Sequence, residues 1–578
     1  MSDTFDAIVV GSGVTGGWAA KELCERGLKV LVLERGRDIV HGGPDYKDML
    51  LPWELEHRNL VPESFELADR YAMLRRKGGT YDQTGLYRQS VLPFFVDDSQ
   101  YPYSYPEDRP FMWTRGYQLG GRSLTWGRQT YRWGPKDFET NAKDGHGLDW
   151  PIRYPDLAPW YDHVEKFIGV SGAHDGLPDL PESIMQPAFE FSSAEKFVAE
   201  NLSRAMPDRR VIMGRCAHIT EPTAEQSALG RGRCLSRNLC ARGCSFGAYF
   251  SSLSATLPAA KRTENLTIIT DKIVHSLVHD PKTRRVTGVR AIDHNSKAGS
   301  EYQGRMIFVC AGSIASVHIL LNSRSEANPT GLANSSDALG RYILDHVSPA
   351  RARGVVPGFD DRFAYGRRPT GVYIPNFRHE QRDGSDFVRG YGYQGGASQR
   401  PDTGTGWDKP GIGAEAKAKA RKPAPWVFSL DMFGEMLPSP NNRATLHPAK
   451  ADPWGIPQIH LDCAIGENER KMIRQGRKDA EDMLRAGGCI NVTGFSLSED
   501  EPMMVGGRTH EMGGACMGRD PRTSVLNGWA QAHDVDNLFV TDGACMASCG
   551  TVNPSLTYMA ITARAADRAV QLLKQGAI

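Results

Sequence analysis

The sequence lacks the features that would place a chain in a membrane or direct its export. Its longest stretch without a charged residue, 543–563, is interrupted by Ser, Thr, Asn and Pro, so it falls short of a span of about 20 apolar residues. The first residues, MSDTFDAIVVGSG, contain no basic segment followed by an apolar one and no twin arginine. We therefore expect this chain to have neither a transmembrane span nor an export signal of its own.

An excess of either charge is also missing. Lys and Arg total 69 and Asp and Glu total 68, which gives a net charge of +1. A chain with this balance has no excess of positive charge to attract the phosphates of a nucleic acid, so we expect no nucleic-acid partner. Internal repeats are absent as well. With 578 residues, of which 40% are hydrophobic, the chain is long enough for about two to four globular domains.

The N-terminal segment has the pattern of a dinucleotide-binding unit. An apolar run, DAIVV, is followed by Gly11, Gly13 and Gly16 in the spacing G-x-G-x-x-G and then by residues with helical spacing. A second apolar run, 29–35, places Glu34 about 20 residues after the turn. The glycines permit a tight turn, close approach to a pyrophosphate and close helix packing, and the carboxylate can accept hydrogen bonds from ribose hydroxyls. The pattern predicts a strand, a turn and a helix that bind a dinucleotide.

Further α/β signals lie far along the chain. Residues 266–270 and 285–292 have the composition of strands, and 306–323 has the pattern of a buried strand, a glycine turn and a helix. The last forty residues, from Asn537, repeat the same plan. We therefore expect a nucleotide-binding domain assembled from both ends and the middle of the sequence.

Six ordered motifs in addition to the N-terminal one resemble the glucose-methanol-choline (GMC) family of flavin oxidoreductases. They are GGRSLTWG (120–127), VCAGSIAS (309–316), NRATLHP (442–448), THEMGGACMG (509–518), NLFVTDG (537–543) and NPSLTYMAITARAAD (553–567). The resemblance covers most of the chain. Within the family the sequence is most similar to the branch of bacterial sugar dehydrogenases that includes glucoside 3-dehydrogenases and the catalytic subunits of glucose and gluconate dehydrogenases.

The resemblance implies an α/β fold. A Rossmann-like FAD-binding domain of the GMC and p-hydroxybenzoate hydroxylase type is then combined with an α+β substrate domain. The FAD-binding domain, including a cysteine-rich loop at 231–250, is expected to comprise residues 1–45, 110–150, 200–345 and 500–578. The substrate-binding domain and its lid segments are expected to comprise residues 46–109, 151–199 and 346–499.

The cofactor implied by the resemblance is FAD. Some relatives attach it covalently through a histidine, but this sequence has Thr125 at that place, so we expect non-covalent binding. The residues expected to bind FAD are Gly11, Gly13, Gly16, Glu34, Arg35, Gly120, Gly121, Ser123, Thr125, Trp126, Gly127, Val274, Ala311, Gly312, Asp542, Gly543, Asn553 and Thr557.

By the same resemblance, His510 and Asn553 take the catalytic positions beside the flavin. The chemistry agrees with this assignment, because oxidation of an alcohol needs a base near neutrality to remove the hydroxyl proton while hydride leaves the carbon. An Asn side chain cannot take a proton, but its amide can hold the hydroxyl oxygen. His346 and His447 are loop histidines that we interpret as structural or as part of the substrate shell.

Cys234, Cys240 and Cys244 follow one another in the spacing C-x5-C-x3-C, in a loop with four arginines. Arginines near thiols would favour thiolates, the ligand form for iron–sulfur clusters. Three thiolates could hold a three-iron cluster, or a four-iron cluster with one further ligand, for which Cys216 is the nearest candidate. Metal-free cysteines or a disulfide are alternatives, and zinc is disfavoured because no His falls at ligand spacing.

The similarity to multi-subunit sugar dehydrogenases favours a 3Fe-4S cluster in this loop. It implies an FAD-dependent dehydrogenase that oxidises a ring hydroxyl of a pyranose or glucoside, at C3 to give a 3-keto sugar. Electrons would pass through the cluster to a cytochrome c subunit. A small export or chaperone-type subunit would carry the complex to the periplasm, where partner subunits would hold it at the membrane; a cytoplasmic location is the alternative.

Two other functions stay open at this point. The first is a cluster-free pyranose oxidase or quinone-reducing sugar dehydrogenase. The second is a non-catalytic flavin-binding subunit, although the presence of His510 and Asn553 argues against it.

Overall fold

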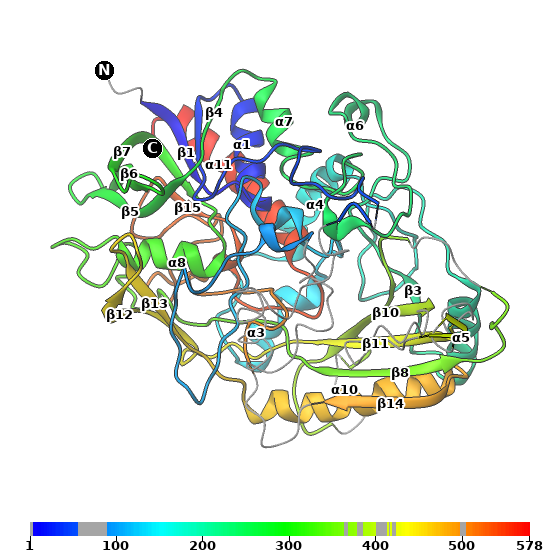
Figure 1. Cartoon of the computed structure of the whole chain (residues 1–578). Helices are drawn as coiled ribbons and strands as arrows, with labels where there is room; N and C mark the ends of the chain where they lie inside the picture. Colours follow the sequence, from blue (N-terminus) through cyan, green and yellow to red (C-terminus); the bar gives the residue numbers. More distant parts are fainter. Residues whose placement is uncertain are drawn as a thin grey trace.

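The structure, a computed structural model, describes residues 4–51, 53–55, 90–362, 368–378, 385–399, 413–414, 417–418, 424–496 and 504–578. Residues 56–89, which belong to the lid segments expected from the sequence, lie outside the described residues. The described chain forms two main sheets with helices packed on them (Figure 1).

The first sheet has seven strands, and five of them are parallel in the order β4–β2–β1–β7–β15. These strands are β1 (Phe5–Val10), β2 (Val30–Leu33), β4 (Leu266–Ile269), β7 (Gly299–Val309) and β15 (Leu538–Val540). The other two, β5 (Lys272–Asp280) and β6 (Arg285–Asp293), continue from β7 as an antiparallel meander. The sheet thus joins the start, middle and end of the sequence, as the apolar runs predict.

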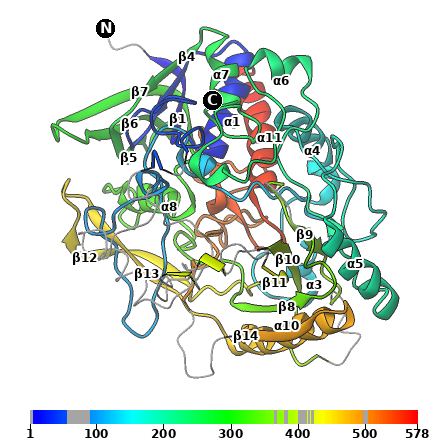
Figure 2. The same ribbon diagram turned by 45° about the vertical axis from the view of Figure 1, so that its right-hand side comes forward.

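Helices pack around this sheet. They include α1 (Val14–Glu25), which follows β1, α8 (Ser313–Asn322), which follows β7, and the C-terminal α11 (Ser555–Lys574). Figure 2 shows α1 and α11 side by side, and α11 also packs on α4 (Tyr154–Ile168). Strand, glycine turn and helix therefore follow one another at β1 and at β7, which confirms the predicted Rossmann-like unit.

The second sheet is antiparallel, with the strand order β14–β8–β11–β10–β9–β3. Its strands are β3 (Ile212–Met213), β8 (Ala350–Val356), β9 (Val372–Ile374), β10 (Tyr391–Gln399), β11 (Trp426–Gly434) and β14 (Ile490–Ser496). The long helix α10 (Glu467–Ala486) lies along β8, β11 and β14 (Figure 1). Its buried residues recur at helical spacing, and Gly476 lets it approach closely, since a Cβ there would lie 2.1 Å from the sulfur of Met432.

Smaller elements complete the fold. They are α3 (Thr140–Asp144), α5 (Ser193–Ala205), α6 (Ala224–Ala228), α7 (Thr256–Lys261), the hairpin of β12 (Arg443–Ala451) and β13 (Pro457–Asp462), and short 3-10 turns at Leu92–Phe94, Gly121–Leu124, Pro135–Phe138, Cys240–Arg242 and Gly543–Cys545. Strand β3 falls within 200–345, the range expected for the FAD-binding domain, yet it pairs with β9 at the edge of the second sheet. It has only two residues, so no hydrophobic pattern marks it.

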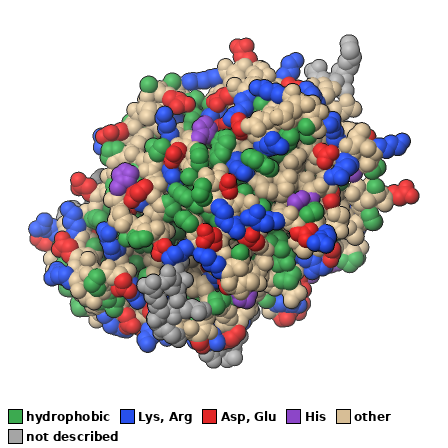
Figure 3. All heavy atoms as spheres, turned by 180° about the vertical axis from the view of Figure 1, so that it is seen from behind, with side chains coloured by type: hydrophobic (Ala, Val, Ile, Leu, Met, Phe, Trp, Pro, Cys, Tyr) green, Lys and Arg blue, Asp and Glu red, His purple; other side chains and the backbone are tan. Residues whose placement is uncertain are grey.

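Charges of both signs are interspersed over the face of the molecule seen in Figure 3, in line with the net charge of +1. Among the described residues, no helix is long and apolar enough to cross a membrane.

Candidate active site

A cavity of about 1850 Å³, measured with its solvent-open mouth, lies at the carboxyl ends of β1, β2 and β7. In α/β sheets this edge is where ligands bind. Its lining runs from the turns after β1 and β7 to the turn before α11, so it suits an extended ligand such as a dinucleotide. Residues from the glycine turns, from the 120–127 motif and from the C-terminal motifs line it.

The cavity brings together most of the residues that the sequence predicts as cofactor-binding. Those that line it are Gly11, Gly13, Glu34, Arg35, Gly121, Ser123, Thr125, Trp126, Gly127, Val274, Ala311, Gly312, Asp542, Gly543 and Asn553. Gly16, Gly120 and Thr557 are not among its lining residues. Gly120 donates its N–H to the hydroxyl of Ser12, and the Thr557 hydroxyl pairs with Tyr161, so both support the wall.

The three N-terminal glycines have distinct physical roles. Gly11 adopts a φ of +94°, and a Cβ there would lie 2.6 Å from the carbonyl oxygen of Cys310. At Gly16 a Cβ would lie 1.9 Å from the carbonyl oxygen of Gly11, so this glycine lets α1 pack against the turn. A Cβ on Gly13 would meet nothing within 4 Å, and the backbone there faces the cavity.

Glu34 is buried at the end of β2 and already accepts three hydrogen bonds. The donors are the backbone N–H and the hydroxyl of Ser12 and the backbone N–H of Gly36. Burial raises the pKa of this carboxyl, and these donors oppose the shift. These bonds fix the carboxylate in the wall of the cavity, where a hydroxyl of a ligand could also reach it.

Asp542, in the turn after β15, fastens the β7–α8 turn to the C-terminal segment. Its carboxylate accepts from the backbone N–H groups of Gly312 at 2.8 Å and Ala544 at 3.0 Å and from the hydroxyl of Ser316. Two glycine turns from distant parts of the sequence therefore form one wall of the cavity.

His510 and Asn553, the predicted catalytic pair, meet at this wall. Nε2 of His510 lies 3.3 Å from Nδ2 of Asn553, and both side chains line the cavity. Asn553 is buried directly before α11, whereas His510 lies in the loop that follows β14. The two nitrogens present an acceptor and a donor to the same point in the cavity.

A backbone bridge explains why His510 lies beside His346. Leu344 and Met512 exchange two hydrogen bonds of 2.8 and 2.9 Å between their backbone groups. Gly513 makes this contact possible, since its φ is +77° and a Cβ would lie 1.8 Å from the carbonyl oxygen of Tyr342. The bridge brings two loops together that are far apart in sequence.

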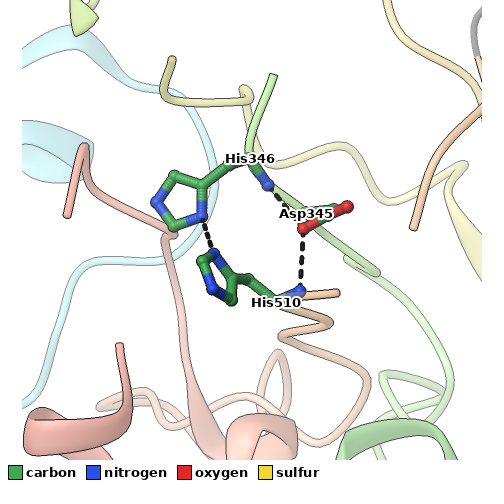
Figure 4. A group of neighbouring side chains, drawn as sticks. All are labelled: Asp345, His346 and His510. Carbon is green, nitrogen blue, oxygen red and sulfur yellow. Dashed lines mark hydrogen bonds between the residues drawn. The ribbon is translucent and has the colours of Figure 1, made fainter. Parts of the chain in front are cut away.

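Figure 4 shows the resulting cluster of Asp345, His346 and His510. The two imidazoles meet through their Nδ1 atoms at 3.0 Å. The carboxylate of Asp345 accepts from the backbone N–H groups of His346 at 2.8 Å, His510 at 3.1 Å and Arg508 at 2.8 Å. Three ligand-type atoms of the cluster lie within 4.8 Å of one another, but the carboxylate oxygens are already engaged by these donors, so hydrogen bonding accounts for the arrangement.

The electrostatics keep both imidazoles neutral. Burial lowers the pKa of His510 well below 6.5, and the positive charges of Arg508 and Arg122 act in the same direction. Burial also lowers the pKa of His346 to about 3. Burial, with the negative charge of Glu511, raises the pKa of Asp345 to about 7. A neutral His510 has a free lone pair at neutral pH and can accept a proton.

Two residues of this site, Gln394 and His346, make contacts that the sequence does not show. Gln394, on β10 of the second sheet, donates from Nε2 to Oδ1 of Asn553. His346, which we interpreted as structural or as part of the substrate shell, instead contacts the base directly. Neither position has a local motif that marks it, because β10 has a mixed composition and His346 is one of several loop histidines.

Cys234, Cys240 and Cys244 lie half-buried in their loop. All eleven cysteines, each within the described residues, are free thiols, so the disulfide alternative finds no support. Sγ of Cys240 lies 3.8 Å from Nε2 of His218, a residue that the spacing does not indicate. The compact group of ligand atoms among the described residues consists of Asp345, His346 and His510 and includes none of these cysteines. A cluster spans several metal ions and needs its thiolates further apart.

The expectation that the loop arginines favour thiolates is wrong for Cys234 and Cys240. Burial raises the pKa of Cys234 to about 11 and also raises that of Cys240, although Arg128 and Arg237 lower the latter. Arg231 donates to the backbone carbonyl oxygens of Gly247 and Ile168. Composition alone could not show which way these guanidinium groups point.

Family models described as GMC oxidoreductase match residues 5–348 and 438–562. The chain belongs to the GMC oxidoreductase family. Enzymes of this family bind FAD and act on CH–OH groups, so the family, fold and type of enzyme predicted from the motifs are confirmed.

Individual relatives are distant but match over their full length. The fructose dehydrogenase large subunit of Gluconobacter japonicus is 27% identical over 583 residues, 99% of this chain and 98% of that protein. The 2-methyl-1,2-propanediol dehydrogenase of Mycolicibacterium austroafricanum is 27% identical, over 98% of this chain and 95% of its own. The solved formate oxidase of Aspergillus oryzae has a TM-score of 0.61 at 15% identity and covers 100% of both chains, a likeness that shows the fold.

The cavity fits FAD in three respects. The open space beside Gly13 leaves room for a pyrophosphate, the Glu34 carboxylate lines the cavity where a ribose hydroxyl could reach it, and His510 and Asn553 line the same cavity.

Two glycine variants separate cofactor binding from folding. Gly13→Ala puts a methyl group into open cavity space, so we expect at least about tenfold weaker FAD binding with an unchanged melting temperature of the apoprotein. Gly16→Ala forces α1 away from the turn, so the apoprotein itself should lose about 1–3 kcal/mol of unfolding free energy. Fluorescence titration with FAD and thermal unfolding measure both effects. Wild-type FAD affinity in Gly13→Ala would contradict the assignment of the cavity.

Proposed function

We propose that this chain is an FAD-dependent sugar dehydrogenase that oxidises a ring hydroxyl of a pyranose or glucoside. The observation that carries the proposal is the pairing of a neutral His510 with Asn553 in the cavity wall, at 3.3 Å. The same cavity has the glycine turns and the carboxylate that suit a dinucleotide.

The chemistry follows from these two side chains. The substrate hydroxyl lies between them, where Nε2 of His510 accepts its proton and Nδ2 of Asn553 donates to its oxygen. FAD, when bound, accepts the hydride from the carbon. Loss of the proton to His510 and of the hydride turns the hydroxyl into a carbonyl group, and His510 then releases the proton to solvent. FAD is held without a covalent bond, and Thr125 lines the cavity where a covalent relative would have a histidine.

The sugar class is supported by relatives whose names include fructose dehydrogenase and gluconate 2-dehydrogenase. The choice of the C3 hydroxyl, with a 3-keto sugar as product, rests on the resemblance of the motifs to glucoside 3-dehydrogenases. It is the part of the proposal that depends least on the geometry of the site.

For the electrons we propose a 3Fe-4S cluster on Cys234, Cys240 and Cys244, which passes them singly to a cytochrome c subunit. Three half-buried thiols on one loop support this, and a metal would deprotonate them in spite of their raised pKa values. The complex would include a small export-type subunit and act in the periplasm. The raised pKa values also favour a second candidate, a cluster-free oxidase or quinone-reducing dehydrogenase.

Anaerobic mixing with methyl glucoside, followed in the visible spectrum with an iron assay, tests these proposals. We expect bleaching of the flavin and about three irons per chain. The variant His510→Gln should bleach about 10²–10⁴-fold more slowly because it lacks the base. His533→Gln, which changes a histidine bonded to Ser524 outside the cavity, is the control and should react at the wild-type rate. Failure of a panel of sugars to bleach the wild type would reject the sugar class and favour a non-catalytic flavin-binding subunit.

A cysteine variant tests the cluster separately. Cys240→Ser should lose most of its iron while methyl glucoside still bleaches the flavin anaerobically, because the proton acceptor and the cavity are untouched. Cys489→Ser, at a buried cysteine before β14, is the matched control and should keep its iron. Equal iron content in the two variants, or none in the wild type, would reject the cluster and leave the cluster-free enzyme.

A further inference from the structure

Four side chains form a continuous chain of contacts with Asn553 and His510 in its middle. Gln394 contacts Asn553, Asn553 contacts His510, and His510 contacts His346. They come from β10, from the turn before α11, and from the two loops joined by the Leu344–Met512 bridge. Each contact joins nitrogen or oxygen atoms at hydrogen-bond distance, so each needs one donor and one acceptor.

The contact between the two imidazoles allows only two hydrogen-bond arrangements. Both rings are neutral, so each has one N–H and one bare nitrogen. At the Nδ1–Nδ1 contact one ring must donate and the other must accept. If His510 donates from Nδ1, its Nε2 is bare and can take a proton. If His346 donates, Nε2 of His510 carries a hydrogen and cannot act as a base.

The surroundings of His346 allow the first of these arrangements. Backbone carbonyl groups of Cys549, Gly550 and Val552 lie near the ring, and carbonyl groups only accept. Its Nε2 is buried with no hydrogen-bond partner among the described residues, so no donor requires this nitrogen to be bare. Nε2 can therefore carry the hydrogen of the ring, which leaves Nδ1 bare to accept from His510.

The other end of the chain decides the direction of the hydrogen bonds. Nε2 of Gln394 donates to Oδ1 of Asn553, which turns Nδ2 of Asn553 toward His510. An amide N–H placed there needs an acceptor, and a bare Nε2 of His510 provides it. Each hydrogen bond then has its donor on the side of Gln394 and its acceptor on the side of His346.

We propose that this directed hydrogen-bond chain sets the tautomer of His510, with the hydrogen on Nδ1 and the lone pair on Nε2, where a substrate hydroxyl that displaces the Asn553 N–H can give up its proton. His346 and Gln394 are therefore positioning residues that act through His510 and Asn553. The role of the tautomer in catalysis rests on the proposed function, whereas the tautomer itself does not.

The charged groups around His510 are consistent with this arrangement. Arg122 is paired with Glu511, and Arg508 donates to the carbonyl oxygen of Met432. The carboxylate of Asp345 bonds to backbone N–H groups and not to either ring. No charged side chain among the described residues is shown bonded to a ring nitrogen of His510, so its neutral partners His346 and Asn553 decide its tautomer.

Histidine-selective ¹⁵N NMR of the FAD-loaded protein tests the proposal without any substrate. The signal of His510 is assigned by its loss in His510→Gln. We expect a neutral ring with its hydrogen on Nδ1. His346→Leu removes the acceptor, so the hydrogen of His510 should no longer be confined to Nδ1. His346→Asn can keep an acceptor oxygen near Nδ1 of His510, so this variant should keep the wild-type tautomer. An ionised Glu in Gln394→Glu cannot donate to Asn553, so this variant should also change the tautomer of His510. It provides the test if His346→Leu does not fold.

A hydrogen on Nε2 of His510 in the wild type would overturn the proposal, as would an unchanged tautomer in both His346→Leu and Gln394→Glu. Kinetics provide a second readout. His346→Leu should slow flavin bleaching by methyl glucoside about 10²–10⁴-fold with unchanged binding of FAD and sugar, as expected for a base in the wrong tautomer, and His346→Asn should restore most of the rate. If no sugar bleaches the wild type, the proposed function fails while the NMR result still decides the tautomer.

Discussion

Two imidazole rings that meet through nitrogen atoms at 3.0 Å, on the buried side of the cavity wall, constrain the whole active site. A buried charge without a partner is costly, so both rings stay neutral and have to share one hydrogen. Hydrogen bonds to Asp345 fix the backbone of the two loops that carry these rings. Asp345 holds three backbone N–H groups from two loops, and these bonds fix both histidines at their backbones without contacting their rings.

The remaining architecture brings His510 and Asn553 to the cavity. The parallel sheet provides the turns that suit a dinucleotide, and the antiparallel sheet provides Gln394, which orients Asn553. Gly513 allows the loop of His510 to approach the segment before β8 so closely that Leu344 and Met512 pair. The proposed reaction therefore depends on both sheets, although the residue that would take the proton lies on neither.

Motifs made much of this fold and site predictable. Glycine spacing and the acidic residue after β2 identified the nucleotide-binding unit, and the context of His510 and Asn553 placed both in the cavity. The positions of Gln394 and His346 depend on the packing of distant segments, which leaves no local pattern. The same reason explains the wrong expectation for the thiols, because burial of the Cys240 thiol outweighs the charges of Arg128 and Arg237.

The dependence of anaerobic flavin bleaching on pH tests the central claim of a neutral, buried base most directly. A base whose pKa is lowered by burial is unprotonated above that pKa and is lost only as the pH falls through it. With methyl glucoside, the rate should stay level above pH 6.5 and decline only below it. A rate that rises about tenfold per unit between pH 6.5 and 8 would show a base that is protonated at neutral pH, and it would contradict this account.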